Sequence, residues 1–520
     1  MLGAAFLVAA GGLPKWRKVG PSGGDEPKYL RTARSLYRDL DADVSENQDG
    51  PLTPGGMARN VRSLAHSTTA ALAALVRGDR PPFDHVWSLG HLTVGAWHGG
   101  QYHILGPGLP ALLAPLVGPG AHDEGDLTVP RAALTLMALV FAVAFVETAF
   151  LAAEACGSRL AGTLAAAAVM ASPAVFVGAY HLYPEALVVA MVPWLARHAS
   201  PRGPSLGLPR VAALGLAAGG LVWLHVKFLP LGVAAAALIA VRLGRSRRLA
   251  LLAVAVAVPL AAWLLFQYWL TGLVRPDALY VRFGSEVWRG RATPGLAWRF
   301  VGGVANGLFG ARDGIFVMLP AAAFAALGLP WLWRRDRRAT VGIAVLFSAV
   351  WLAAALHGGG APGPPGRLLS PGAPLLAAPL SAGLQGLRDR LAFRWGLAAA
   401  VIVSLVMVAS MARNPRLTIN PYRGVAESGD PRPDLPGGRS DPAGAALDVA
   451  RAGLLLAVVG FWAWRFSPRQ SVPRSPSPPA TAPARALGVL RDAVAFQAGA
   501  WVTLALTAAA LRGLTRLAGG

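Results

Sequence analysis

The sequence predicts an all-α polytopic membrane protein, and three observations support this prediction. First, 54% of the 520 residues are hydrophobic and 14% are charged, whereas charged residues make up about a quarter of a typical soluble domain. Second, many apolar segments approach the length of about 20 residues with which a helix crosses a bilayer. Third, short arginine clusters separate these segments, for example at 242–248 and 334–338. A soluble globular fold and a largely disordered chain are both disfavoured.

The basic charge of the chain fits the same prediction. Lysine and arginine number 48 against 26 aspartates and glutamates, which gives a net charge of +22. Such a charge is typical of nucleic-acid-binding proteins, but no nucleic-acid-binding motif accompanies it, and arginines between spans mark the cytoplasmic side of membrane proteins. We therefore expect membrane lipids and no nucleic acid as partners. Because Cys156 is the one cysteine, an intrachain disulfide and a cysteine-based metal cluster are excluded.

The N-terminal part is predicted to hold one incomplete span and a long outer loop. Residues 1–14 are apolar but too short to cross a bilayer at about 1.5 Å per residue, so they form either a partial helix or, as we favour, the end of a first span that begins upstream of Met1. Residues 15–130 are predicted to form an extracytoplasmic loop with an amphipathic helix. Within it, the apolar run 104–117 contains three prolines and two glycines and is predicted to be a re-entrant hairpin that does not cross.

A transmembrane core is predicted at 131–412. Its segment 211–241 is interrupted by the polar residues around His225 and Lys227 and is interpreted as two short helices joined by a turn. The other predicted spans of the core lie at 131–153, 159–180, 185–197, 249–270, 314–333, 339–356, 368–387 and 395–412.

Beyond the core, one more outer loop and two more spans are expected. The predicted segments are an outer loop at 413–447, a span at 448–466, a proline-rich cytoplasmic linker at 467–485 and a last span at 486–511. Placing the arginine-rich segments in the cytoplasm gives about 13 spans. The prediction is therefore a multi-pass protein of the plasma (inner) membrane.

Asp25 and Glu26 begin a predicted amphipathic helix in the first outer loop. Pro27 suits the first helical turn, and acidic residues suit the positions before it. Apolar residues from Leu30 to Leu40 share one side and arginines the other, which is typical of a helix that lies on the membrane surface. Both carboxylates are thus expected near the lipid headgroups; the alternative interpretation is that they only cap the helix.

Two spans carry charged residues at their predicted outer ends. Glu185 follows Tyr183 and a proline at the start of an apolar segment, where a carboxylate is costly unless it is paired or lines a polar cavity. Lys227, with His225 two residues before it, is a cation at the membrane boundary that can hold a phosphate. The alternatives are a helix cap for Glu185 and a lysine that snorkels toward water.

Two loops complete the set of polar segments on the predicted outer face. His103 precedes Gly106-Pro107-Gly108, whose glycines allow another backbone to approach closely. His357 begins a run without bulky side chains that ends at Arg367, whose guanidinium suits bidentate binding of a phosphate. The alternatives are a plain turn and an ordinary charged loop.

Carboxylates and cations from distant parts of the chain are thus predicted to meet at one membrane face. Transfer of a group from a lipid-linked phosphate donor needs this combination, because a carboxylate can accept the proton of an attacking hydroxyl and cations can stabilise the departing phosphate. A metal pair at Asp41 and Asp43 is a further alternative, since carboxylates ligate hard divalent cations; a solvated acidic loop is the other interpretation of these residues.

Several of these motifs, in this order, resemble the GT-C-type polytopic membrane glycosyltransferases, the bacterial relatives of dolichyl-phosphate-mannose–protein mannosyltransferases. The motifs are GDEPKYL at 24–30, GPGLP at 106–110, LYPE at 182–185, WLHVK at 223–227 and PGRL at 365–368. The resemblance implies a bundle of about 11–13 transmembrane helices and an inverting enzyme with a polyprenyl-phosphate sugar as donor. One departure is Lys28, where the family often has histidine.

The resemblance also implies roles for individual residues. Asp25, with Glu26 beside it, corresponds to the catalytic base, and Lys227 and Arg367 correspond to groups that bind the donor phosphate. His225, two residues before Lys227, is also predicted to bind the donor phosphate. The residues predicted to line the cavity are His103, Tyr183, Glu185 and His357. A divalent cation is an open cofactor prediction, and the acceptor is unassigned.

Two other function classes stand beside this prediction. A lipid or sugar transporter or flippase would show internal repeats and broken helices near the membrane midplane, and Glu147 is a charged residue inside a predicted span. A catalytically inactive assembly protein with the same fold is the third class, because one fold hosts many functions.

Overall fold

The structure analysed is a computed structural model of the chain. It describes residues 26–39, 42–44, 54–81, 87–88, 92–97, 100–103, 105–117, 129–176, 178, 181–279, 307–308, 314–356 and 367–413. The predicted first span at 1–14, the segments predicted beyond 413, and the residues Asp25, Asp41 and His357 lie outside these ranges.

Long apolar helices dominate the part of the chain that the structure describes. Five helical segments there are long and apolar enough to cross a membrane. They are α6 (Arg131–Cys156), the 3₁₀ turn η3 (Val226–Phe228) continued by α11 (Leu229–Leu243), α12 (Arg247–Thr271), most of α18 (Arg337–Leu356) and most of α20 (Leu391–Arg413). The chain is therefore a helical, multi-pass membrane protein, as the composition predicts.

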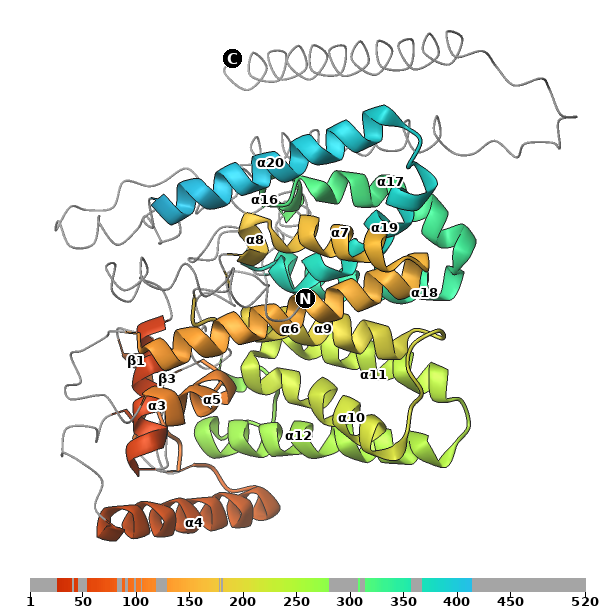
Figure 1. The fold of residues 1–520 in the computed structure, drawn as a ribbon. Helices are drawn as coiled ribbons and strands as arrows, with labels where there is room; N and C mark the ends of the chain where they lie inside the picture. The colour runs from red at the N-terminus through yellow and green to blue at the C-terminus, as the bar shows by residue number, and fades with distance from the viewer. Residues whose placement is uncertain are drawn as a thin grey trace, which may run out of the picture.

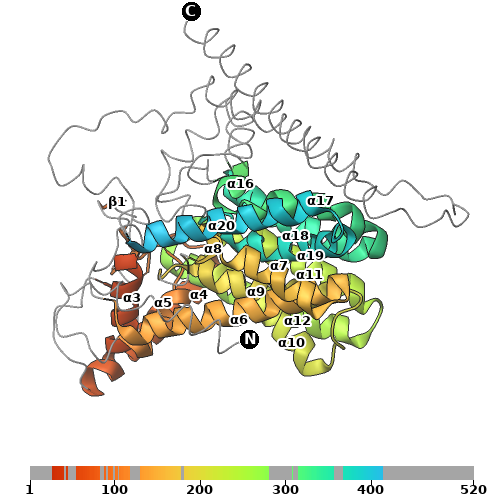
Figure 2. The same ribbon diagram turned by 45° about the horizontal axis from the view of Figure 1, so that its top comes forward.

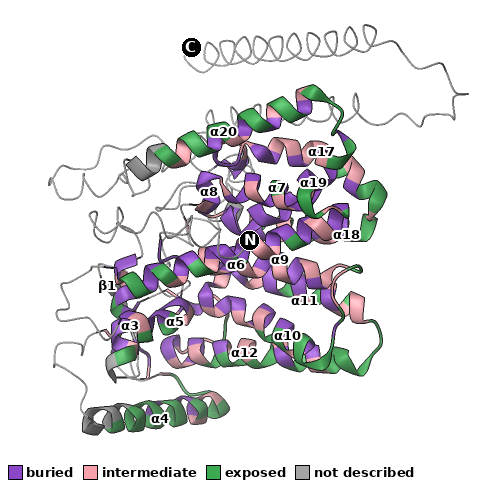
Figure 3. Cartoon of the chain, in the orientation of Figure 1, coloured by how far each residue is buried: buried purple, intermediate pink, exposed green. Residues whose placement is uncertain are grey.

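Shorter helices complete the bundle between these spans. They are α7 (Arg159–Met170), α8 (Pro173–Phe176), α9 (Pro184–Ala199), α10 (Leu208–Leu224), α16 (Ile315–Met318), α17 (Ala321–Arg335), the 3₁₀ segment η4 (Ser370–Leu376) and α19 (Ala377–Gly386). The long helices run side by side, and α20 lies along one side of the bundle near α8 and α17 (Figures 1 and 2). Exposed apolar side chains include Val258 on α12 and Val406 on α20, which suits contact with lipid, and Figure 3 shows many exposed residues along α20.

The predicted interruption of segment 211–241 is confirmed. Helix α10 ends at Leu224, His225 adopts an extended backbone, and α11 starts again after the turn η3. The predicted span at 159–180 is also broken, since α7 ends at Met170 and α8 begins at Pro173. A proline cannot donate a backbone hydrogen bond and disfavours a helical residue before it, which accounts for this second break.

The N-terminal elements gather at one end of the bundle, on the left in Figure 1. Helix α3 (Glu26–Asp39) packs against α5 (Gly108–Val117), and α4 (Pro54–Arg77) lies beside α12. Tyr29 and Leu30 of α3 are fully buried against Leu109 and Leu113 of α5. The apolar side of the predicted amphipathic helix therefore contacts protein.

The prediction of an all-α chain needs one small correction. Strands β1 (Trp87–Ser88), β2 (Leu92–Val94) and β3 (Gln101–His103) form an antiparallel sheet in the order β1-β2-β3. Tyr102 of β3 packs edge-on against Trp269 near the end of α12, with ring centroids 5.4 Å apart. Strands of two or three residues are too short to show the alternation of apolar and polar residues that predicts a strand from sequence.

The predicted apolar hairpin at 104–117 is wrong, because residues 108–117 form the single helix α5. Pro107 precedes this helix and Pro110 lies in its first turn, where the backbone has no helical hydrogen bond to lose. These prolines therefore start a helix where we expected them to divide one.

Small residues allow the helices of the core to approach closely, as is common in membranes. A methyl group at Gly219 of α10 would collide with the carbonyl of Val256 and the ring of Pro259 on α12. Similarly, alanines of α6, α7, α17 and α19 form much of one buried cluster. These contacts hold α9 and α10 in the positions from which the polar residues at their ends meet.

The bundle has two chemically distinct ends. Helix α9 carries Glu185 in its first turn and Arg197 in its last turn. At about 1.5 Å per residue, the rise from Glu185 to Arg197 separates the two by about 18 Å. We call the end near Glu185, Lys227 and Arg367 the site end. The opposite end, with Arg197, Arg202, Arg242, Arg335 and Arg337, is the arginine-rich end.

Candidate functional site

Glu185 is placed by the local structure at the start of α9. Tyr183 has an extended backbone, and Pro184 occupies the first helical position, where its fixed φ suits a helix. Glu185 follows in the first turn, where the positive end of the helix dipole favours a carboxylate. Its side chain is 3% exposed. A buried carboxylate at this depth requires compensating charge, and the structure supplies it from two other segments.

Lys227 comes from the turn η3 between α10 and α11. Nδ1 of His225 accepts a hydrogen bond from the backbone N–H of Lys227 at 3.1 Å, which stabilises the tight turn. The turn directs Lys227 toward α9, where Nζ donates to Oε1 of Glu185. The side chain of Lys227 is 4% exposed. The lysine therefore does not snorkel toward water. It forms an ion pair with Glu185.

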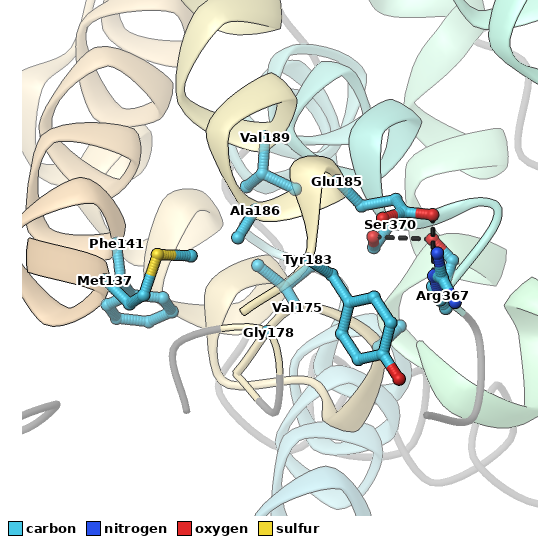
Figure 4. Close-up of a pocket in the computed structure, with 11 residues that line it drawn as sticks. Met137, Phe141, Val175, Gly178, Tyr183, Glu185, Ala186, Val189, Arg367 and Ser370 are labelled. Carbon is cyan, nitrogen blue, oxygen red and sulfur yellow. Dashed lines mark hydrogen bonds and ion pairs between the residues drawn. The ribbon is translucent and has the colours of Figure 1, made fainter. Parts of the chain in front are cut away.

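Arg367 reaches the same carboxylate from the segment just before η4. Its Nε donates to Oε1 of Glu185 at 2.7 Å, and its guanidinium lies over the ring of Tyr183, 3.9 Å from the centroid. Ser370 Oγ donates to the carbonyl of Arg367 at 2.8 Å and fixes the turn. Figure 4 shows Arg367, Ser370 and Glu185 gathered on one side of the pocket with the Tyr183 ring beside them.

The resulting cluster carries one carboxylate and two cations. Glu185, Lys227 and Arg367 are all buried, and with all three ionised the cluster has a net positive charge. Oε1 of Glu185 accepts from both cations, whereas no described residue donates to Oε2. The cluster therefore offers a positive charge for an anion and one carboxylate oxygen for a hydroxyl group.

A pocket of about 430 Å³, its open mouth included, adjoins this cluster. Tyr183, Glu185, Arg367 and Ser370 supply its polar side. The remaining lining is largely apolar and comes from Met137, Phe141, Ala174, Val175, Gly178, Ala186 and Val189 (Figure 4). Tyr183 and Glu185 thus lie where the sequence predicts a cavity lining. A ligand with a charged group and an apolar part would match these two sides.

Glu26 is tied to the segment that leads into α9. Its Oε1 accepts from the backbone N–H of Leu182 at 2.8 Å and from Nδ1 of His181 at 3.0 Å. Both side chains of the Glu26–His181 pair are 1% exposed. Tyr29, one turn further along α3, contacts Tyr183 edge-on with ring centroids 6.4 Å apart. The start of α3 is therefore fixed beside His181, Leu182 and Tyr183.

His181 is a residue that the sequence predictions did not select. It lies between the end of α8 and the LYPE motif, contacts Glu26, and has its ring centroid 5.6 Å from that of Tyr183. The neighbouring LYPE motif indicated a functional segment. A histidine before an apolar helix is common, however, and does not by itself indicate a site residue. Its partner could not be deduced, because Glu26 is separated from it by 155 residues.

The predicted residues His225 and His103 do not line the pocket in the described part of the chain. His225 instead holds the turn that carries Lys227. His103 is buried in β3, where it pairs across the sheet with Leu92. Nearby, the GPGLP motif acts as predicted: a methyl group at Gly108 would come within 2.8 Å of the Trp223 carbonyl, so the glycine permits α5 to touch the end of α10.

Asp43 makes structural contacts in the N-terminal elements. Its Oδ1 accepts from the backbone N–H of Gln101 at 2.8 Å, and its carbonyl accepts from Ser35 Oγ at 2.6 Å. Asp43 is 1% exposed, so the interpretation of a solvated loop is wrong for this residue. The described residues hold no group of three or more His, Cys, Asp or Glu arranged for a metal ion.

Glu147, the charged residue inside a predicted span, has a partner at the arginine-rich end. Arg197 Nη1 lies 2.8 Å from Glu147 Oε2, and Arg197 Nε lies 2.7 Å from Glu154 Oε1. Arg197 thereby joins the last turn of α9 to α6. The charge of Glu147 is accounted for by this helix–helix contact.

Comparisons with known proteins find similarity in structure. No family model matches the chain, and no curated protein matches it. The chain is similar to the crystal structure of ArnT from Cupriavidus metallidurans bound to undecaprenyl phosphate, with 15% sequence identity and a TM-score of 0.45. That similarity covers 89% of this chain and 74% of the ArnT chain.

Proposed function

We propose that the protein is a membrane glycosyltransferase that takes its sugar from a polyprenyl-phosphate donor. The observation that carries the proposal is the buried Glu185–Lys227–Arg367 cluster beside a pocket with an apolar side. Two cations for one carboxylate leave a positive charge, which suits the phosphate of the donor. The apolar side suits the isoprenoid part of the same molecule, and the resemblance of the sequence motifs supports the same donor class.

In the proposed reaction, an acceptor hydroxyl attacks the anomeric carbon of the donor sugar. The bond between this carbon and the phosphate oxygen breaks, its electron pair leaves with the lipid phosphate, and the sugar is inverted. Asp25 accepts the hydroxyl proton as general base. Lys227 and Arg367 stabilise the negative charge that grows on the departing phosphate. Glu26 acts as a positioning residue, because it ties the start of α3 to the turn before α9.

The orientation of the site follows from the arginine distribution. The arginine-rich end is proposed to face the cytoplasm, which places the site end on the extracytoplasmic face of the plasma (inner) membrane. The polar cluster lies at the ends of helices and not at their centres, an arrangement that favours an enzyme acting at headgroup depth over a transporter with a midplane site.

The test uses purified full-length protein and radiolabelled polyprenyl-phosphate sugars. We expect the wild type to release lipid phosphate. Asp25→Asn is expected to lower the rate by about 10²–10⁴-fold, and Lys227→Gln or Arg367→Gln by about 10²–10³-fold. The matched control is Arg131→Gln, an exposed arginine at the site end, which is expected to retain the wild-type rate.

Two outcomes would reject the proposal. One is a wild-type rate in the Asp25→Asn and Arg367→Gln variants. The other is movement of the intact donor across the bilayer of proteoliposomes with no release of lipid phosphate, which would identify a flippase. Parallel reactions with a divalent cation and with a chelator test the open prediction of a metal cofactor.

A further inference from the structure

A second cleft lies at the arginine-rich end, remote from the proposed active site. It has a volume of about 1680 Å³, its open mouth included, and is bounded by α6, α9, α11 and α18. The basic residues among its lining are Arg202, Arg242, Arg337 and Arg338, and the acidic ones are Glu154 and Asp336. The cleft is therefore positively charged at the end of the bundle.

Both acidic residues of the cleft already have partners. Glu154 Oε1 accepts from Arg197 Nε at 2.7 Å. Asp336 lies 3.3 Å from Arg202 Nε and accepts from the backbone N–H of Ala339 at 2.9 Å, which caps α18. Arg197 and Arg202 are thus the direct ion-pair partners of these acids, and Glu154 also interacts with Arg242 through space.

Three arginines of the cleft form no ion pair with a described carboxylate. Arg242 donates to the carbonyls of His198, Gly203 and Pro204, so its position is fixed while its charge is not neutralised by a direct contact. Arg337 and Arg338 are exposed at the first positions of α18. An anion at this point would meet these two arginine side chains.

An apolar wall continues from these arginines into the bundle. Leu238 on α11 and Gly342, Ile343 and Leu346 on α18 line the same cleft. The nine residues from Arg338 to Leu346 extend about 12 Å along α18, which is most of the hydrocarbon depth of one leaflet, about 15 Å. The cleft thus joins a basic mouth at a helix end to an apolar wall that points toward the bilayer interior.

We propose that this cleft binds an anionic phospholipid. The phosphate of the headgroup lies between Arg337, Arg338 and Arg242, and one acyl chain lies along Leu238, Ile343 and Leu346. Basic pockets between transmembrane helices bind acidic headgroups in this manner. A free phosphate would gain the charge interaction but would leave the apolar wall uncovered.

The experiment measures binding of radiolabelled dioleoyl-phosphatidylglycerol to the full chain in a nonionic detergent. We expect saturable binding that unlabelled phosphatidylglycerol displaces and that phosphatidylcholine displaces at least about tenfold less well, because it carries no net charge. Inorganic phosphate and glycerol phosphate are expected not to compete at matched concentration and ionic strength. Full competition by either would show a site for the free anion and would overturn the proposal.

Two variants separate the charge from the apolar wall. The double variant Arg337→Gln/Arg338→Gln is expected to weaken phosphatidylglycerol binding by about twentyfold, since each arginine near the surface contributes about 1 kcal/mol. Its matched control, Arg245→Gln/Arg247→Gln, removes the same charge from exposed arginines at the same end that do not line the cleft. An equal loss in both variants would indicate unspecific surface charge and would overturn the proposal.

Gly342→Leu tests the wall while leaving every charge in place. A Cβ at Gly342 meets only Leu238 Cδ1 at 3.8 Å, so the backbone has room for a side chain, and leucine favours a helix more than glycine does. The larger side chain fills the cleft and is expected to weaken phosphatidylglycerol binding at least about tenfold with an unchanged melting temperature. Wild-type affinity in this variant would contradict the proposed position of the acyl chain.

Discussion

At the scale of single residues, Oε1 of Glu185 accepts hydrogen bonds from both Lys227 and Arg367. Three segments far apart in the sequence are therefore connected through one atom. A buried cation is costly without a counter-charge, so Glu185 does more than line the pocket: it permits two cations to remain buried and charged. Loss of this carboxylate should affect folding as well as phosphate binding.

A double-mutant cycle measures this effect. Glu185→Gln leaves two buried cations without a counter-charge and is expected to lower the free energy of unfolding by about 3–5 kcal/mol. Adding Lys227→Met removes one of those cations, so the double variant should be more stable than the sum of the two single effects by about 1–3 kcal/mol. Unfolding of the purified protein in mixed detergent measures all four forms. Strictly additive effects would contradict a shared ion pair.

The residues of this cluster could be predicted because charges at the ends of apolar segments are rare and costly. That argument selects Glu185, Lys227 and Arg367 from the sequence, but it does not say which carboxylate meets which cation. The Glu26–His181 contact illustrates the limit. It depends on how α3 lies against the turn before α9, and no local pattern in either segment contains that information.

At the scale of elements, the contact between α5 and the end of α10 supports the turn that carries Lys227. Gly108 allows this contact, since any Cβ there would press on the Trp223 carbonyl. The site is thus sensitive to a helix that contributes no residue to the pocket lining in the described part of the chain.

Gly108→Ala tests this support. Overpacking against a backbone carbonyl is expected to lower the free energy of unfolding by about 1–3 kcal/mol and to reduce glycosyl transfer by displacing Lys227. The matched control is Gly220→Ala on α10, where a Cβ meets nothing within 4 Å and alanine favours the helix by up to about 1 kcal/mol. Equal stability of the two variants would show that the α5 contact is dispensable.

The elements of the core could be predicted more fully than those of the first loop. Long apolar segments predict membrane helices by their composition alone. The polar residues around His225 predicted the break between α10 and α11. The short strands β1, β2 and β3 carry no comparable signal. In α5 the prolines were given too much weight as helix breakers: Pro107 and Pro110 lie just before the helix and in its first turn, and the helix also contains Pro115.

At the scale of the whole molecule, the charge distribution predicts which end faces which compartment. In a Cys156→Ala background, which removes the one native cysteine, a single cysteine is introduced at the exposed positions Arg275 or Ser205. Arg275 lies just after α12 ends at the site end, and Ser205 lies between α9 and α10 at the arginine-rich end.

The expected result follows from the positive-inside distribution. A membrane-impermeant maleimide added to intact cells is expected to label the Arg275→Cys protein. The Ser205→Cys protein should be labelled only after the membrane is permeabilised. The reverse pattern would place the proposed active site on the cytoplasmic face and would contradict its proposed extracytoplasmic position.

Helix α9 is held by ion pairs at both of its ends. Its first turn is bound to Lys227 and Arg367, and its last turn is bound through Arg197 to Glu147 and Glu154 of α6. Tilting or sliding α9 would break buried ion pairs at its first turn or partly buried ones at its last turn, so we expect this helix to keep its position during the proposed reaction. The proposed donor must then be admitted by displacement of the neighbours of α9, and we expect a probe on α9 to report no movement when that donor is added.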